Sequence, residues 1–136
     1  MSFMDSIKTC FSKYFDFSGR ARRSEFWWFM LLYLIVSIIP IVQIAVLGMI
    51  IPIIAVTARR LHDTDRSGWW QLAPLVPMAI GGGILAAGLS TGDGTSALTI
   101  VGGIVALLGF VVGILLIVWY ASDSQPGPNR FGPSPK

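Results

Sequence analysis

The stretch ARRLHDTDRSGWW, residues 58–70, lies between two long segments that carry no charge. It holds three arginines, two aspartates, the only histidine and two adjacent tryptophans. Residues 26–58, 67–92 and 94–122 are entirely uncharged. A bilayer hydrocarbon core is ~30 Å thick and takes about 20 apolar helical residues to cross. The sequence therefore predicts helices that enter a membrane and are joined by short charged turns.

The composition is that of a membrane protein. The 136 residues are 54% hydrophobic and only 12% charged, and the mean hydropathy is +0.70, which ordinary soluble domains of this size do not show. The first long apolar segment begins only at Phe26, so we expect no cleaved signal peptide. Cys10 is the only cysteine, which excludes an intramolecular disulfide and a zinc site made of cysteines. We expect Cys10 to act as a small apolar residue on a helix.

Residues 3–17 predict an amphipathic helix. Apolar side chains recur at helical spacing along one stripe and polar ones along the other: Phe3, Ile7, Cys10, Phe11 and Tyr14 against Asp5, Lys8, Ser12 and Lys13. We expect this helix to lie in the membrane interface with its lysines toward anionic headgroups. SGRARR, residues 18–23, then predicts a turn, and Ser24 with Glu25 predicts the start of the next helix.

The uncharged segment 26–58 predicts a pair of helices, at residues 24–39 and 44–61. As one straight helix its 33 residues would extend roughly 50 Å, beyond the hydrocarbon core, while two full crossings need about 40 residues. Pro40 lacks a backbone N–H and disfavours helical geometry at Ile39, so we expect the chain to reverse there. Two short crossings and a re-entrant pair of half-helices both stay open.

The distribution of positive charge predicts the orientation. The ten basic residues fall into three blocks, at residues 8–23, 59–66 and 130–136. If residues 26–58 cross twice, or enter and return, all three blocks lie on one face, as the positive-inside rule expects. A single crossing would leave five basic residues on the opposite face, so the double pass is the favoured interpretation, and a re-entrant pair of half-helices gives the same sidedness. We therefore expect both termini in the cytoplasm of a bacterial cell, in a multi-pass protein of the inner membrane.

Two further spans are expected at residues 69–89 and 97–120, joined by an outer turn that carries Asp93. All five tryptophans then lie at the inner interface, where an indole ring is favoured. The tail, residues 121–136, has four of the eight prolines and predicts little regular structure. The predicted fold is an all-α integral membrane protein, a four-helix polytopic bundle preceded by an N-terminal amphipathic interfacial helix, in one membrane domain over residues 1–136.

Small residues recur four apart on the last two helices, a pattern that lets helix backbones approach closely in membranes. The stripes are Ala79, Gly83 and Ala87; Gly102 with Ala106; and Gly109 with Gly113. Packing within the chain is the favoured interpretation. A homo-oligomer through Gly109 and Gly113 is the alternative.

The arginine clusters allow three interpretations. They determine topology, bind anionic lipid headgroups, or join the cytoplasmic segments through ion pairs, for example Glu25 or Asp63 with an arginine of the other cluster. The interleaved acids favour the last interpretation slightly over lipid binding. The uncharged spans argue against a proton relay or an ion-coupled transporter.

His62 next to Asp63 resembles an oriented general base. Adjacent residues on one helix do not face each other, however. One histidine with scattered aspartates is a poor set of metal ligands. No serine or cysteine nucleophile has a spacing that suggests a catalytic triad. We expect no catalytic residue, no metal and no cofactor.

Three blocks, GRARRSEFWW at 19–28, RRLHDTDRSGWW at 59–70 and GPNRFGP at 127–133, resemble the signature of a bacterial inner-membrane family, catalogued as domain of unknown function 805. The resemblance implies a small polytopic protein with four helices and implies no reaction. Asp65 stands where the family commonly has a glycine, and the stretch that joins the first two blocks is shorter than usual. The three blocks meet at the cytoplasmic face, so we expect one composite polar surface with the tail folded back on it.

The leading hypothesis is a non-enzymatic protein, with a role in envelope maintenance, whose cytoplasmic Arg/Asp/Trp surface binds a partner protein or anionic membrane lipid. Nucleic acid is not an expected partner. An oligomeric pore or carrier for a small solute is the alternative, and a membrane enzyme that uses His62 and Asp63 is the third hypothesis. The predicted binding residues are Arg20, Arg23, Glu25, Arg59, Arg60, His62, Asp63, Arg66, Trp69, Trp70, Asn129 and Arg130.

Overall fold

The computed structural model describes residues 1–135 of the chain. Its helical segments are α1 (Phe3–Ser12), α2 (Arg23–Ile38), η1 (Pro40–Val42), α3 (Gln43–Asp63), η2 (Gly68–Leu72), α4 (Leu75–Leu89) and α5 (Ala97–Ala121). These described residues contain no strand beyond an isolated bridge between Asn129 and Gly132. The predicted all-α class is confirmed.

Three stretches are long and apolar enough to cross a membrane: Pro40–Asp63, Gly68–Leu89 and Ala97–Ala121. The 16 residues of α2 extend only about 24 Å at ~1.5 Å per residue, which is short of a ~30 Å hydrocarbon core. The contacts divide the chain into two compact units, Met1–Gly68 with the segment from Trp119 onward, and Trp69–Val118. The single four-helix bundle stays a prediction.

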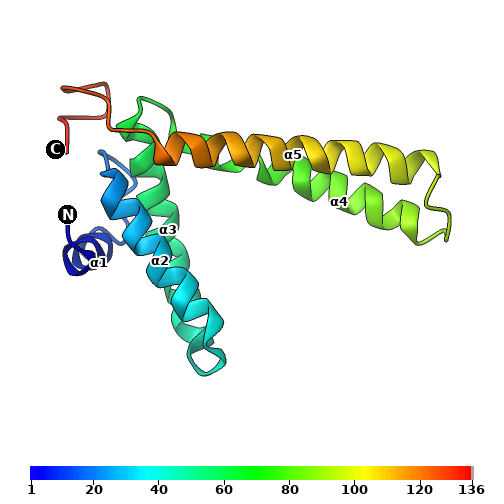
Figure 1. The fold of residues 1–136 in the computed structure, drawn as a ribbon, viewed down its shortest axis with the longest axis horizontal. Helices are drawn as coiled ribbons and strands as arrows, with labels where there is room; N and C mark the ends of the chain where they lie inside the picture. Colours follow the sequence, from blue (N-terminus) through cyan, green and yellow to red (C-terminus); the bar gives the residue numbers. More distant parts are fainter. Residues whose placement is uncertain (136) are drawn as a thin grey trace. The chain divides into compact units, whose positions relative to one another are not determined.

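In the first unit α2 and α3 form an antiparallel hairpin with η1 at its tip, and α1 packs beside α2 (Figure 1). The core includes Cys10, Phe26 and Phe29, and the Phe11 and Phe29 rings meet edge to face at 5.5 Å. Ser2 caps α1 by accepting from the Asp5 backbone N–H at 3.2 Å. The helix ends at Ser12, five residues before the expected end, because Asp16 accepts from the Ser18 backbone in a local turn, a competitor of helix that aspartate favours.

Pro52 lies inside α3 and frees a carbonyl that a residue in the turn after α1 binds. A proline has no N–H, so the carbonyl four residues earlier, that of Gly48, loses its helical donor. The Tyr14 hydroxyl donates to this carbonyl at 2.8 Å. A free carbonyl is costly where water is scarce, and Tyr14 removes that cost. The sequence interpretation overlooked Pro52.

The end of α3 is a Schellman motif. The Asp65 N–H donates to the His62 carbonyl at 3.0 Å, and the Arg66 N–H donates to the Leu61 carbonyl at 2.9 Å. This motif needs a left-handed residue just after the helix, usually glycine. Asp65 takes that position with φ 60°, which aspartate tolerates better than most residues.

In the second unit α4 and α5 lie side by side through glycine (Figure 1). A Cβ on Gly81 would lie 2.3 Å from the Ala106 backbone nitrogen, and one on Gly102 would lie 2.3 Å from the Leu85 nitrogen. Close approach of this kind is how small residues pack helices in membranes. The expected α5 stripe is correct, whereas the expected α4 stripe of Ala79, Gly83 and Ala87 is wrong, because these residues are exposed and Gly81 and Gly88 make the contact.

The predicted third span is not one continuous helix. It is divided into η2 and α4, and Pro74 stands at the N-cap of α4, where a missing N–H costs little. Gly109 lies against Met78 and Pro74 of the same chain. The Gly109 surface, which the sequence suggested as a homo-oligomer contact, therefore packs within the chain.

Candidate functional site

Two carboxylates and three guanidinium groups form a buried arginine cluster in the first unit: Arg20, Glu25, Arg59, Arg60 and Asp63. Asp63 accepts from Arg20 Nε at 2.9 Å on one oxygen and from Arg60 Nη1 on the other. The side chains of all three are at most 1% exposed. Asp63 therefore joins the loop before α2 to the end of α3, as the interleaved charges predicted.

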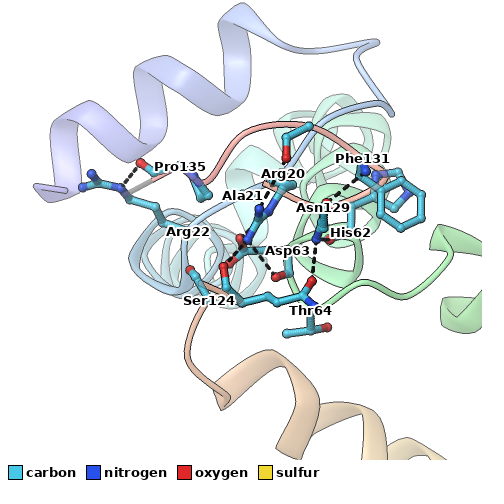
Figure 2. A network of polar contacts seen from close by, with 12 residues as sticks. Arg20, Ala21, Arg22, His62, Asp63, Thr64, Ser124, Asn129, Phe131 and Pro135 are labelled. Carbon is cyan, nitrogen blue, oxygen red and sulfur yellow. Dashed lines mark hydrogen bonds and ion pairs between the residues drawn. The ribbon is translucent and has the colours of Figure 1, made fainter. Parts of the chain in front are cut away.

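The remaining donors of Arg20 bind backbone carbonyls of the tail and of Asp63 (Figure 2). Nη2 donates to the Gln125 carbonyl at 2.6 Å and to the Asp63 carbonyl at 3.2 Å. Nη1 donates to the Gly127 carbonyl at 2.7 Å. The rigid guanidinium fork thus holds the tail against the end of α3, and the predicted folding back of the tail is confirmed.

Arg60 donates to a second set of carbonyls. Nε donates to Tyr120 at 2.9 Å, Nη1 to Ala21 at 3.3 Å, and Nη2 to Ser122. The buried guanidinium is therefore surrounded by acceptors from three segments of the first unit. Such full pairing is what a buried charge requires.

Glu25 pairs with Arg59, the second ion pair that the sequence suggested. Arg59 is fully buried, yet its Nε and Nη2 have no hydrogen-bond partner among the described protein atoms. The Cys10 thiol lies 3.8 Å from Glu25 Oε1. Burial, and then the negative charge of Glu25, raise the pKa of Cys10 to about 12, so the thiol stays protonated at neutral pH.

His62 and Asn129 complete the attachment of the tail (Figure 2). Asn129 Nδ2 donates to the His62 carbonyl at 2.9 Å, and the Phe131 ring stacks on the imidazole at 3.9 Å with the planes 3° apart. His62 Nδ1 lies 2.8 Å from the Gly19 carbonyl oxygen, so Nδ1 is the protonated nitrogen of the neutral ring. The Asp63 carboxylate is used by arginines and does not orient His62.

The other predicted binding residues of this unit lie at its surface. Arg66 covers the Trp119 ring at 4.0 Å, and Arg130 pairs with Asp65 at 3.1 Å with both side chains largely exposed. Arg23 and Arg22 line a surface hollow of about 350 Å³ with Ser24 and Asp123. We call these four residues the α2 hollow.

Trp69 and Trp70 belong to the second unit. With Leu72, Ala73 and Val76 they line an apolar hollow of about 330 Å³. The structure thus groups most of the predicted residues in the first unit and assigns these two tryptophans to the second. Across residues 1–135 no three His, Cys, Asp or Glu side chains are grouped as metal ligands.

Sequence reasoning missed the backbone part of the cluster. The carbonyls of Tyr120, Ser122 and Gln125 accept from buried arginines, but a backbone acceptor has no residue type that marks it. The free carbonyl of Gly48 could have been found, because a proline within a helix removes the donor of the carbonyl four residues earlier.

The family described as "Protein of unknown function (DUF805)" matches residues 14–45 and 38–133. The chain belongs to this family. The DUF805 match covers every residue of the buried arginine cluster and the part of the tail that binds it. The resemblance drawn from the three sequence blocks is confirmed.

Two relatives of this DUF805 protein cover nearly its whole length. Inner membrane protein YhaI of Escherichia coli (strain K12) is 32% identical over 136 residues, 90% of this chain and 88% of the relative. Inner membrane protein YhaH of the same strain is 30% identical over 150 residues, 98% of either chain. No solved structure matches. With the three apolar helices, these relatives identify the chain as a membrane protein of an inner-membrane family.

Proposed function

We propose that this DUF805 protein is a non-enzymatic protein of the inner membrane with both termini in the cytoplasm. The buried arginine cluster holds its cytoplasmic face together, and the α2 hollow binds the headgroup of an anionic lipid. Of the predicted binding residues only Arg23 belongs to the α2 hollow, whose other members, Arg22, Ser24 and Asp123, come from the structure.

The division between a structural and a binding group rests on how the guanidinium groups are used. Arg20 and Arg60 are buried, and their donors go to carboxylates and backbone carbonyls of the chain itself. Among the described residues, Arg22 and Arg23 each donate to one backbone carbonyl, those of Pro135 and Ala121, at the wall of an open hollow. Asp123 offsets one of the two charges there, which leaves one positive charge for a phosphate. A guanidinium can bind phosphate through two parallel hydrogen bonds.

The proposed orientation follows from charge. Lys8, Lys13 and the arginines of the first unit would all lie on the cytoplasmic side, as the positive-inside rule expects. The short helix α1 would then lie in the interface. Inner membrane protein YhaI and inner membrane protein YhaH support the choice of membrane.

The contacts of His62 and Asp63 favour the non-enzymatic hypothesis. The imidazole is stacked under Phe131 and bonded to Gly19, and both oxygens of Asp63 are used by arginines. These residues have structural partners that account for their positions. His62 is also buried, whereas a general base must lie within reach of a substrate.

Lipid titration of the purified protein tests the α2 hollow. Native mass spectrometry with added phosphatidylglycerol or phosphatidylcholine should show a preference for phosphatidylglycerol. In the Arg22→Gln/Arg23→Gln variant we expect that preference to fall about 30-fold, since each basic residue near an anionic surface contributes about 1 kcal/mol.

Arg130→Gln is the matched control, because Asp65 already pairs with that arginine. Its lipid preference should change less than threefold. Equal phosphatidylglycerol binding by the double variant and the wild type would refute the lipid site. A copurifying protein that is lost only from the double variant would favour a protein partner instead.

A further inference from the structure

The tip of the α2–α3 hairpin is an apolar surface. Ile38 is 78% exposed, Ile41 is 93% exposed and Ile44 is 85% exposed. No charged residue lies between residues 26 and 58. A turn that emerged into water would expose this surface at a large cost, whereas hydrocarbon would accept it.

The polar groups of the tip are bonded within the hairpin. Gln43 Nε2 donates to the carbonyls of Ser37 at 3.1 Å and Ile39 at 3.0 Å. The Ser37 hydroxyl donates to the Leu34 carbonyl at 2.8 Å. Backbone that lies in hydrocarbon must have its polar groups paired inside the protein. The only amide side chain of the tip meets that requirement at the point where the chain reverses.

The position of α1 limits how deep the hairpin reaches. Phe3 contacts Trp28 at 5.5 Å, Phe11 contacts Phe29 at 5.5 Å, and Tyr14 reaches the Gly48 carbonyl. This helix therefore lies at the level of residues 28–29 on α2, and Tyr14, in the turn that follows it, lies at the level of residue 48 on α3. Asp5 and Lys8 of α1 are exposed, and exposed charges do not lie in hydrocarbon. The hydrocarbon thus begins at the level of α1 or beyond it.

The length of hairpin beyond α1 matches one leaflet. The 11 residues from Phe29 to Pro40 rise about 17 Å, and the eight residues from Pro40 to Gly48 rise about 12 Å. Half of a ~30 Å hydrocarbon core is about 15 Å. Although Pro40–Asp63 is long enough to span, its last nine residues, 55–63, are buried within the first unit and include Arg59, Arg60 and Asp63 of the arginine cluster.

We propose that the α2–α3 hairpin is re-entrant and one leaflet deep, so that its isoleucine tip contacts the acyl-chain ends at the middle of the bilayer. It enters from the face that carries the buried arginine cluster. The side of entry rests on the proposed cytoplasmic orientation, whereas the depth does not. Under this proposal only α4 and α5 cross the membrane.

Spin labels on single cysteines measure the depth directly. In a Cys10→Ala background, labels at Leu34, Ile38, Ile41 and Leu47 are compared in proteoliposomes by their accessibility to oxygen and to a water-soluble nickel chelate. We expect the greatest depth at residue 41, with residues 34 and 47 shallower. A maximum at residues 34 and 47, with residue 41 as accessible to nickel as the aqueous turn, would overturn the proposal.

Thr95→Cys, in the turn between α4 and α5, is the matched control for sidedness. In intact spheroplasts a membrane-impermeant maleimide should label the Thr95→Cys variant from outside and leave the Ile41→Cys variant unlabelled until detergent is added. Labelling of both variants from outside would show a hairpin that crosses. Labelling of the Thr95→Cys variant only from the cytoplasm would refute the orientation and leave the depth profile to decide the re-entrant hairpin separately.

Discussion

The two helix pairs of this molecule are held together in different ways. In the first unit α3 is joined to its neighbours by ion pairs and by hydrogen bonds from arginine to backbone carbonyls. In the second unit α4 and α5 approach so closely that single Cβ atoms would overlap the opposing backbone. Charges are stable near water or when fully paired, while glycine contacts need no water. The first pair is thus held by charges that are paired with each other and with carbonyls, and the second by direct contact between helix backbones.

Asp63→Asn should have the largest effect. It removes the partner of both Arg20 and Arg60 and leaves two buried guanidinium groups short of one negative charge. Breaking a buried pair in this way costs about 3–5 kcal/mol. The midpoint of denaturant unfolding in detergent should fall accordingly, and the tail from Ser122 onward should become sensitive to protease.

Asp65→Asn is the control for Asp63→Asn. Asp65 also pairs with an arginine, but both side chains are largely exposed, and such surface pairs contribute about 0–1 kcal/mol. Equal losses in the two variants would contradict the structural role assigned to the buried arginine cluster.

Gly102→Ala tests the close backbone contact between α4 and α5. Its Cβ would lie 2.3 Å from the Leu85 nitrogen, so α4 and α5 must separate, and overpacking of this kind costs about 1–3 kcal/mol. Gly103→Ala meets nothing within 4 Å and should not destabilise. Thermal unfolding in detergent and cysteine cross-linking between α4 and α5 measure the difference. A similar loss for Gly103→Ala would refute close packing on the Gly102 face.

How far the sequence reveals each region depends on what holds it together. The ion pairs of Glu25 and Asp63 with arginines could be predicted, because buried charges need opposite charges and the sequence interleaves acidic with basic residues. The α4 contact was misassigned because a helix with Gly81, Gly82 and Gly83 in succession offers a small-residue stripe on several faces. Periodicity alone cannot select among them. The carbonyls that bind Arg20 and Arg60 depend on how the tail folds, which no spacing of side chains specifies.

Tyr14→Phe should have an intermediate effect. The variant leaves the Gly48 carbonyl without the hydroxyl donor that lies 2.8 Å away, at a cost of about 0.5–1.5 kcal/mol. Pro52→Ala restores an N–H that can donate to that carbonyl within α3. In the Pro52→Ala background Tyr14→Phe should therefore cost much less. Additive effects in this double-mutant cycle, measured by chemical unfolding, would show that Tyr14 does not compensate for the proline.

Asp65→Gly should have the smallest effect and the opposite sign. Asp65 has φ 60° at the end of α3, a conformation that costs most side chains about 1–2 kcal/mol and glycine almost nothing. The exposed pair with Arg130, worth about 0–1 kcal/mol, is lost in exchange. Asp65→Ala loses the same pair and keeps a Cβ, so the difference between Gly and Ala isolates the backbone term. We expect Asp65→Gly to unfold at a slightly higher denaturant concentration than the wild type and Asp65→Ala at a lower one. A glycine variant no more stable than the alanine variant would mean that Arg130, rather than the Schellman turn, determines the conformation of this position.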